Sequence, residues 1–117
     1  MGKIRIAICD DEPNMRSYLT ALIRREDASC RISEYASAEA YLAAREDHDL
    51  LLLDIELGGG AGSPGSMDGM ALARRLRSLP PDRQPLIIFV TGYESYVYQA
   101  FDVEAFQYLV KPVDEGR

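Results

Sequence analysis

The sequence predicts an α/β fold built on a parallel sheet, and two observations lead to that prediction. Short apolar segments alternate along the chain with segments whose apolar residues recur at helical spacing, a pattern typical of βαβ units. One apolar segment, the four leucines at residues 50–53, is continuous, which indicates a strand buried on both faces. The 117 residues, 1–117, are expected to form one domain around one core, with no internal repeat and no inter-domain linker.

Two helices are predicted before the leucine strand. The first begins at Pro13, because proline is tolerated in the first turn of a helix. Its apolar face, spaced i, i+4, i+7, i+8, comprises Met15, Leu19, Leu22 and Ile23. The second begins near Ser37, a suitable N-cap, and carries Tyr41 and Leu42. The predicted strands around these helices are residues 3–9, 30–35 and 50–54.

The second half of the chain continues the alternation. A third helix begins near Asp68. Its predicted inward residues are Leu72, Leu76 and Leu79, and its predicted outward residues are Arg74, Arg75 and Arg77. The sequence PPDRQP then interrupts the pattern. The remaining predicted elements are strands at residues 86–91 and 106–110, with a helix at about residues 95–101 between them.

The charge balance and the cysteine content limit the possible function classes. Thirteen basic and nineteen acidic residues give a net charge of −6, which disfavours nucleic-acid binding by this chain itself. Cys9 and Cys30 lack a metal-binding spacing, and Cys9 is expected to be a buried free thiol. Neither a signal peptide nor an apolar run long enough to cross a bilayer is evident, so we expect a cytoplasmic protein with no membrane partner.

Polar residues collect where the predicted strands end. Asp10 and Asp11 follow the first strand, Asp54 ends the third, Thr91 ends the fourth and Lys111 follows the fifth. Because the carboxyl ends of parallel strands meet at one edge of the sheet, these side chains are expected to converge. Carboxylates about 5 Å apart repel by about 3 kcal/mol at an effective dielectric of about 20, and Mg²⁺, which prefers oxygen ligands, would relieve that repulsion. An aspartate there could accept a phosphoryl group as a nucleophile.

Other catalytic chemistries find little support in the sequence. His48 is the only histidine and lies in the polar stretch REDHD, so we expect it in a solvated loop. With a single histidine, expected in solvent, a histidine-based metal site or a Ser-His-Asp triad has little to build on. An aspartate-nucleophile phosphatase would carry D-x-D-x-T after the first strand, where this chain has CDDEP.

Five motifs in order, AICDDEP, LLLLDIEL, MDGM, FVTGYE and YLVKPVD, resemble the receiver domain of two-component response regulators. The resemblance covers essentially the whole chain. It implies a doubly wound, flavodoxin-like sheet of five parallel strands in the order 2-1-3-4-5. The family continues into a fifth helix, and this chain ends at Arg117 before it. The segment TGYESYVYQAFDVEAFQYLVKP is similar to receivers whose output is a LytTR-type DNA-binding domain.

The resemblance also assigns a phosphorylation site and a metal site. It implies that Asp54 is the phosphoacceptor. The phosphoryl group would come from a phosphohistidine on a sensor histidine kinase. The implied Mg²⁺ ligands are Asp11 directly, Asp10 largely through water, Asp54, and the backbone carbonyl of Glu56. Such a domain catalyses its own phosphotransfer and dephosphorylation only, so it is not expected to be an enzyme in the metabolic sense.

A switch is implied as well. Thr91 matches the hydroxyl that moves toward the phosphoryl group, Tyr108 the aromatic residue whose rotamer changes with it, and Lys111 the lysine that pairs with the phosphoryl group. The Lys111–Pro112 bond matches the family's cis peptide. A homodimer is possible, and DNA would be bound only through an output domain that this chain lacks. The alternative left open is a protein-interaction module that works without phosphorylation.

The chain departs from the family pattern after Asp54, where the segment up to Asp68 is seven residues longer than expected. Residues 60–65, GAGSPG, match the dinucleotide fingerprint G-x-G-x-x-G, but they neither begin at the strand end nor open the helix, so we reject that reading. A tolerated insertion or a flap beside the phosphorylation site remain the two hypotheses. Gly92, where the family has a small residue such as alanine, would leave room for the phosphoryl group.

Overall fold

A computed structural model describes residues 3–57, 67–92, 105 and 107–110, and these residues form a five-stranded sheet with helices on both faces. The strands are β1 (Arg5–Cys9), β2 (Arg31–Tyr35), β3 (Leu50–Leu53), β4 (Leu86–Thr91) and β5 (Gln107–Val110). All four neighbouring pairs are parallel, in the order β2-β1-β3-β4-β5. The predicted fold class and strand order are therefore confirmed.

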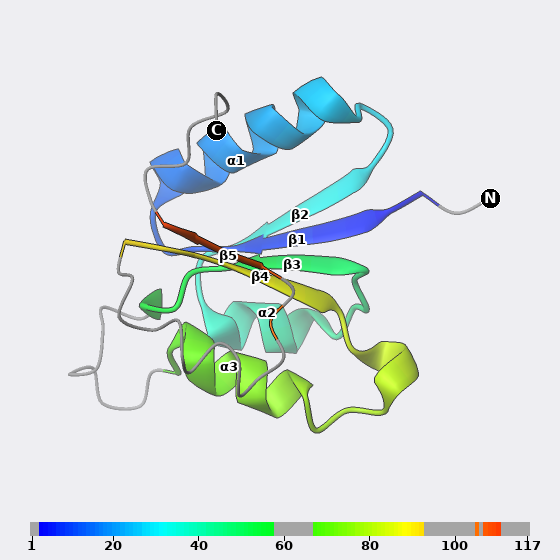
Figure 1. The fold of residues 1–117 in the computed structure, drawn as a ribbon, viewed down its shortest axis with the longest axis vertical. Coiled ribbons are helices and arrows are strands. Elements are labelled where there is room, and N and C mark those ends of the chain that lie inside the picture. Colours follow the sequence, from blue (N-terminus) through cyan, green and yellow to red (C-terminus); the bar gives the residue numbers. More distant parts are fainter. Residues whose placement is uncertain (1–2, 58–66, 93–104, 106, 111–117) are drawn as a thin grey trace.

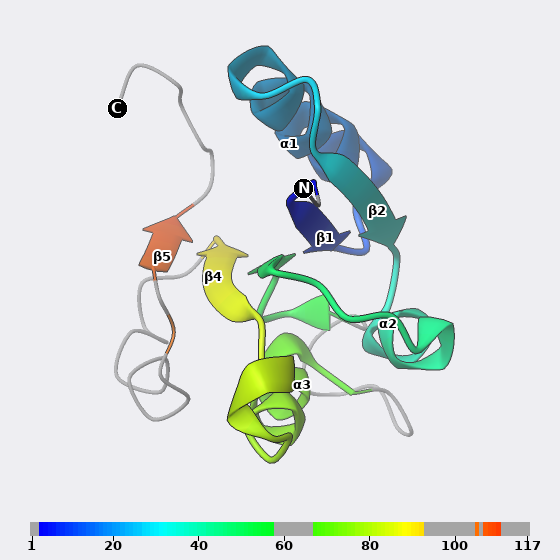
Figure 2. The same ribbon diagram turned by 90° about the vertical axis from the view of Figure 1, so that its right-hand side faces the viewer.

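The described helices divide between the two faces of the sheet. The long helix α1 (Pro13–Glu26) covers one face, and α2 (Ala38–Ala44) and α3 (Gly69–Leu76) cover the other (Figures 1 and 2). A 3-10 turn, Pro81–Arg83, follows α3 within the predicted PPDRQP break. None of the described helices is long and apolar enough to cross a membrane.

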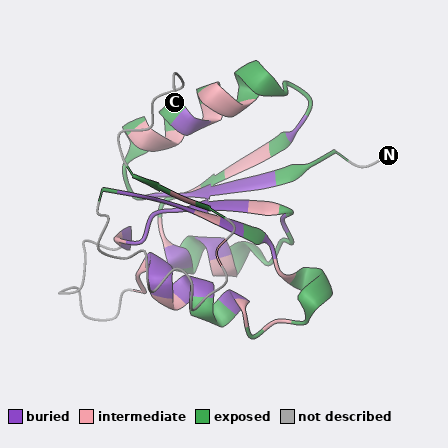
Figure 3. Cartoon of the chain, viewed as in Figure 1, coloured by how far each residue is buried: buried purple, intermediate pink, exposed green. Residues whose placement is uncertain are grey.

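The leucine strand β3 supplies both halves of the core, as its continuous apolar sequence predicts. Leu51 and Leu53 pack into the cluster beneath α2 and α3, whereas Leu52 packs with Leu19 of α1 on the other face. Figure 3 shows the buried residues concentrated in the central strands and in the inward sides of the helices. Each fully buried leucine side chain contributes about 1.5–3 kcal/mol to folding, so β3 anchors both layers.

The helix starts follow the sequence signals. Pro13 is the first residue of α1, and the Ser37 hydroxyl caps α2 by accepting a hydrogen bond from the N–H of Ala40 at 3.0 Å. The Asp68 carboxylate caps α3 in the same way, accepting from the N–H of Ala71 at 2.8 Å. Each such cap stabilises a helix by about 1 kcal/mol.

The end of α3 differs from the prediction. The helix stops at Leu76, and Arg77, expected on the outward face, is half-buried. Its guanidinium donates to the side-chain oxygen of Gln84 and to the carbonyl of Pro85, both at 3.1 Å. The expectation was wrong because these oxygens, in the turn that leads into β4, offered Arg77 better partners than solvent. The predicted helix at residues 95–101 lies outside the described residues.

Candidate functional site

The register of the sheet brings the ends of β1, β3 and β4 together. Cys9 pairs with Leu53, and Leu53 pairs with Phe89, so the residues that follow these strands share one edge. The backbone N–H of Asp54 donates to the carbonyl of Cys9 at 3.0 Å, which continues the ladder by one residue past β3. The predicted convergence is thus found for the carboxylates of Asp10 and Asp54, and the register places Thr91 at the same edge of the sheet.

Three carboxylates gather at this edge. One side-chain oxygen from each of Asp10, Glu12 and Asp54 lies within 4.8 Å of the other two. Asp10 and Asp54 are buried, at 1% and 6% exposure, whereas Glu12 is exposed. An all-oxygen donor set of this kind fits a hard divalent cation such as Mg²⁺.

The local backbone orients two of these carboxylates. The N–H of Glu12 donates to Asp10 Oδ1 at 2.9 Å, and the N–H of Glu56 donates to Asp54 Oδ1 at 3.1 Å. Each bond closes a short turn in which an aspartate accepts from the residue two positions later. Both aspartates are therefore held by their own loops, and the backbone N–H of Glu56 lies beside the Asp54 carboxylate.

Glu12 was not singled out from the sequence. Asp11, assigned as a direct metal ligand by the resemblance, is exposed and is not one of the three clustered carboxylates. The turn at Asp10 returns the chain so that Glu12 joins Asp10 and Asp54. The run of three acids before Pro13 was the available signal, since any of them could have reached the site.

Thr91 is fully buried at the end of β4, and its hydroxyl oxygen has no hydrogen-bond partner among the described residues. An unsatisfied buried hydroxyl costs about 1–3 kcal/mol. Beside it, no described atom lies within 4 Å of the position that a Cβ on Gly92 would take. The end of β4 thus combines a hydroxyl that could take a new partner with open space next to it.

Tyr108 lies on the neighbouring strand. It pairs with Phe89 across β4 and β5, and the two rings stand 6.3 Å apart at 60°, an edge-to-face contact. Val110, which pairs with Thr91, ends β5. Lys111, the Lys111–Pro112 bond and the glycine-rich residues 58–66 lie outside the described residues.

The thiol of Cys9 lies beneath the acidic cluster. Burial, together with the negative charges of Asp10 and Asp54, raises the pKa of Cys9 to about 12. Its sulfur contacts the carbonyl of Ser37 at 3.5 Å. A thiol with so high a pKa stays protonated at neutral pH and is a poor nucleophile. Cys9 is a buried free thiol as predicted, and Cys30 is also buried and free.

His48 lies at the opposite edge of the sheet and is not in a solvated loop. It is 7% exposed, and its ring lies 5.9 Å from that of Tyr35 and 5.6 Å from that of Tyr41 between centroids, while the two tyrosine rings lie 5.3 Å from each other. Its Nε2 is 3.9 Å from a carboxylate oxygen of Glu46. The expectation was wrong because two tyrosines from other segments of the chain pack against the imidazole.

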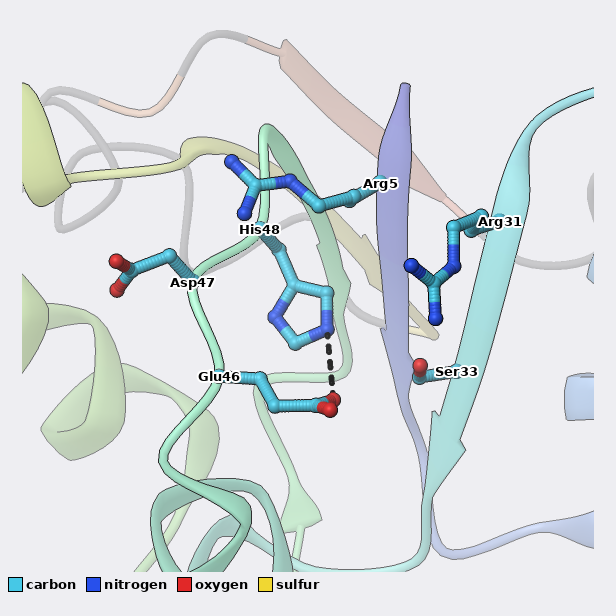
Figure 4. A pocket seen from close by; sticks show the side chains of 6 residues that line it. All are labelled: Arg5, Arg31, Ser33, Glu46, Asp47 and His48. Atoms are coloured by element: carbon cyan, nitrogen blue, oxygen red, sulfur yellow. Dashed lines mark ion pairs between the residues drawn. The ribbon is translucent and has the colours of Figure 1, made fainter. Parts of the chain in front are cut away.

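A pocket of about 240 Å³ adjoins His48. Its lining residues are Arg5, Arg31, Ser33, Glu46, Asp47 and His48 (Figure 4). Two of its charged groups are paired outside this set of residues: Arg5 with Asp49 and Asp47 with Arg83, both at 3.3 Å. These opposing charges leave the pocket without a net charge that would select an anion or a cation.

Comparisons with known proteins agree with this geometry. The family model for the response regulator receiver domain matches residues 6–117. The chain is 35% identical over 116 residues to the sensory transduction protein LytT of Bacillus subtilis (strain 168), covering 97% of this chain and 44% of that protein. It is 33% identical over 116 residues to the transcriptional regulatory protein BtsR of Escherichia coli (strain K12), with the same coverage. The chain therefore spans less than half the length of these relatives.

Solved structures show the same fold. A CheY-like receiver domain protein from Methanospirillum hungatei JF-1 superimposes with a TM-score of 0.79 at 26% identity, covering 97% of this chain and 85% of that one. The response regulator TrrA of Thermotoga maritima, in complex with Mg(2+)-BeF, gives a TM-score of 0.76 at 29% identity, covering 95% and 89%. The family match, these relatives and the strand order lead to one conclusion: the chain belongs to the receiver domains of two-component response regulators.

Proposed function

We propose that this domain is a phosphoacceptor switch that takes a phosphoryl group from a sensor histidine kinase onto Asp54. The observation that carries the proposal is the carboxylate cluster: a buried Asp54 has oxygens of Asp10 and Glu12 within 4.8 Å. Such a group of negative charges is costly unless a cation joins it. Positioning a phosphoryl donor next to a carboxylate is most of what phosphoryl transfer requires.

The proposed metal is Mg²⁺, held by oxygens of Asp10 and Asp54, with Asp11 and the Glu56 carbonyl as the further ligands that the resemblance implies. Glu12 is a candidate for the same sphere, because its carboxylate reaches the cluster. When bound, the cation neutralises the carboxylates and the phosphoryl oxygens that share it. The related TrrA was solved with Mg(2+)-BeF, which supports a magnesium site in this family.

The transfer step uses Asp54 as the nucleophile. One carboxylate oxygen of Asp54 attacks phosphorus, the P–N bond to the kinase imidazole breaks, and its electron pair returns to the imidazole, which takes a proton from solvent. The backbone N–H of Glu56 holds the other carboxylate oxygen of Asp54 during attack. Lys111 is proposed to pair with the phosphoryl oxygens.

The signal is proposed to leave through Thr91 and Tyr108. A phosphoryl group on Asp54 would offer the buried Thr91 hydroxyl an acceptor that it lacks among the described residues. Movement of Thr91 toward that acceptor would open space beneath β5, into which the Tyr108 ring could turn. The domain would catalyse only its own phosphorylation and dephosphorylation.

The proposed output is transcriptional regulation in the cytoplasm. BtsR is named as a transcriptional regulatory protein and LytT as a sensory transduction protein, and each is more than twice as long as the segment matched here. DNA contact would then come from an output domain, and a homodimer could accompany phosphorylation. The alternative, a phosphorylation-independent interaction module, makes no use of the acidic cluster.

Intact mass after incubation with acetyl phosphate tests the proposal. The wild type with Mg²⁺ should gain one phosphoryl group, and the gain should be lost without Mg²⁺ and in Asp54→Ala. Asp82→Asn, which removes an exposed acid from the 3-10 turn, is the matched control and should label like the wild type. No adduct on the wild type would contradict the phosphoacceptor role and favour the interaction module.

A further inference from the structure

The guanidinium group of Arg16, which is not one of the clustered carboxylate residues, binds the backbone of the acidic cluster. Arg16, in the first half of α1, donates from its NH1 to the carbonyl of Asp10 at 2.7 Å. That carbonyl belongs to the peptide unit that joins Asp10 to Asp11. The preceding peptide unit is held by the backbone, since the N–H of Asp10 donates to the carbonyl of Tyr35 at 3.0 Å. The Arg16 side chain thus helps to fix the orientation of the Asp10–Asp11 peptide.

Arg16 is itself held in place. Its Nε lies 3.4 Å from a carboxylate oxygen of Glu34 on β2, and the other Glu34 oxygen accepts from the Thr20 hydroxyl at 2.9 Å. The Arg16 side chain is only 18% exposed, so solvent competes weakly for it. The planar fork of a guanidinium can serve a carbonyl and a carboxylate at once, which a lysine ammonium does less well.

We propose that Arg16 is a positioning residue of the metal site. Rotation of the Asp10–Asp11 peptide would swing both flanking carboxylates, so the Arg16 bond keeps them in the orientation that a cation needs. This inference rests on the proposed Mg²⁺ site. A positioning role and a purely electrostatic role predict opposite effects of removing Arg16 on Mg²⁺ affinity. A positive charge that only repels Mg²⁺ would, when removed, tighten Mg²⁺ binding, whereas loss of a positioning residue weakens it.

The same helix offers a matched control. Arg24, two turns further along α1, donates to the carbonyls of Ala28 and Cys30, near the other edge of the sheet. Arg24→Gln therefore removes one positive charge and a guanidinium–carbonyl contact without touching the acidic cluster. Arg16→Gln removes the same kind of group from the metal site.

The test is Mg²⁺ affinity, measured by titration of the ¹⁵N-labelled domain in NMR spectra, with thermal unfolding recorded for each variant. Arg16→Gln should weaken Mg²⁺ binding about tenfold, the usual loss when a partner behind a metal ligand is removed. Arg24→Gln should bind like the wild type. Arg16→Lys keeps the charge but not the fork, so it should still bind Mg²⁺ about threefold more weakly than the wild type.

Glu34→Gln extends the test to a variant that retains Arg16, in case Arg16→Gln does not fold. It should weaken Mg²⁺ binding about threefold, and less than additively with Arg16→Gln, because the two residues act on one peptide. Unchanged or tighter binding in the Arg16 variants would overturn the positioning role while leaving the proposed function intact. Failure of the wild type to bind Mg²⁺ would overturn both.

Discussion

Gly69 lies directly against the carbonyl of Asp54: a Cβ on Gly69 would stand 2.0 Å from that oxygen. The Gly69 N–H also donates to the carbonyl of Ile55 at 2.8 Å. The first residue of α3 is therefore packed on the backbone that carries the proposed phosphoacceptor. Only a residue without a side chain allows the helix to approach this closely.

Gly69→Ala should destabilise the domain by about 3 kcal/mol, since the contact is with backbone and neither side can move easily. Urea unfolding measures the change. Gly92→Ala is the control, because no described atom lies within 4 Å of its added carbon, and its effect should stay within about 0.5 kcal/mol. Equal stability of the two variants would show that α3 can shift without cost.

Thr91→Val should leave stability unchanged or raise it by about 1 kcal/mol, because it replaces a buried hydroxyl with no described partner by a methyl group. Thr20→Val is the matched comparison and should lose about 1 kcal/mol, since the Thr20 hydroxyl donates to Glu34. Chemical denaturation of both variants checks the pair. A large loss for Thr91→Val would mean that its hydroxyl already has a structural partner.

Much of this fold could be predicted because its determinants are local. The four leucines of β3, the proline that opens α1 and the caps Ser37 and Asp68 each act within a few residues. Asp10, Asp54 and Thr91 could be grouped from the sequence because parallel strands bring their ends to one edge. That inference needed only the positions where the strands end in the sequence and their parallel direction.

The features that sequence reasoning missed depend on contacts between distant segments. Burial of His48 requires Tyr35 and Tyr41, which no periodicity connects to it. The place of Glu12 in the acidic cluster follows from one turn at Asp10. Arg16 acts on a backbone carbonyl, and a carbonyl leaves no signature in the sequence.

Stability should fall as the pH drops below about 6.5, because of His48. Burial lowers the pKa of His48 from 6.5, and Arg5 lowers it further, whereas Glu46, Asp47 and Asp49 oppose the shift. The unfolded chain therefore binds a proton more readily than the folded one. The contribution of His48 is fully present above pH 6.5 and is lost as the pH falls through the folded-state pKa.

Unfolding free energies of the wild type and His48→Gln, measured between pH 5 and pH 8, isolate this effect. The domain has a single histidine, so the difference between the two curves should carry the His48 slope alone. The wild type should lose its advantage over the variant toward pH 5. Parallel curves would mean that the folded and unfolded states bind a proton at His48 equally well.

Asp10→Asn should have opposite effects on two properties: it should raise the stability of the metal-free domain and weaken Mg²⁺ binding. Asp10 is 1% exposed and lies within 4.8 Å of two other carboxylates, so removal of its charge should stabilise the metal-free domain by about 1–2 kcal/mol. Saturating Mg²⁺ should raise the thermal midpoint of the wild type through binding to the folded state, and EDTA should reverse that rise. In Asp10→Asn the rise should be largely lost.

Asp82→Asn, the exposed acid on the 3-10 turn, should match the wild type with and without Mg²⁺. Suppose that Asp10→Asn is less stable than the wild type without metal and gains as much from Mg²⁺. That result would contradict the view that the three carboxylates repel one another in the metal-free domain. A variant that is more stable without metal and responds less to Mg²⁺ would show that this repulsion destabilises the metal-free domain. A domain that is more stable without its buried aspartate retains the residue for chemistry, since folding alone would favour its loss.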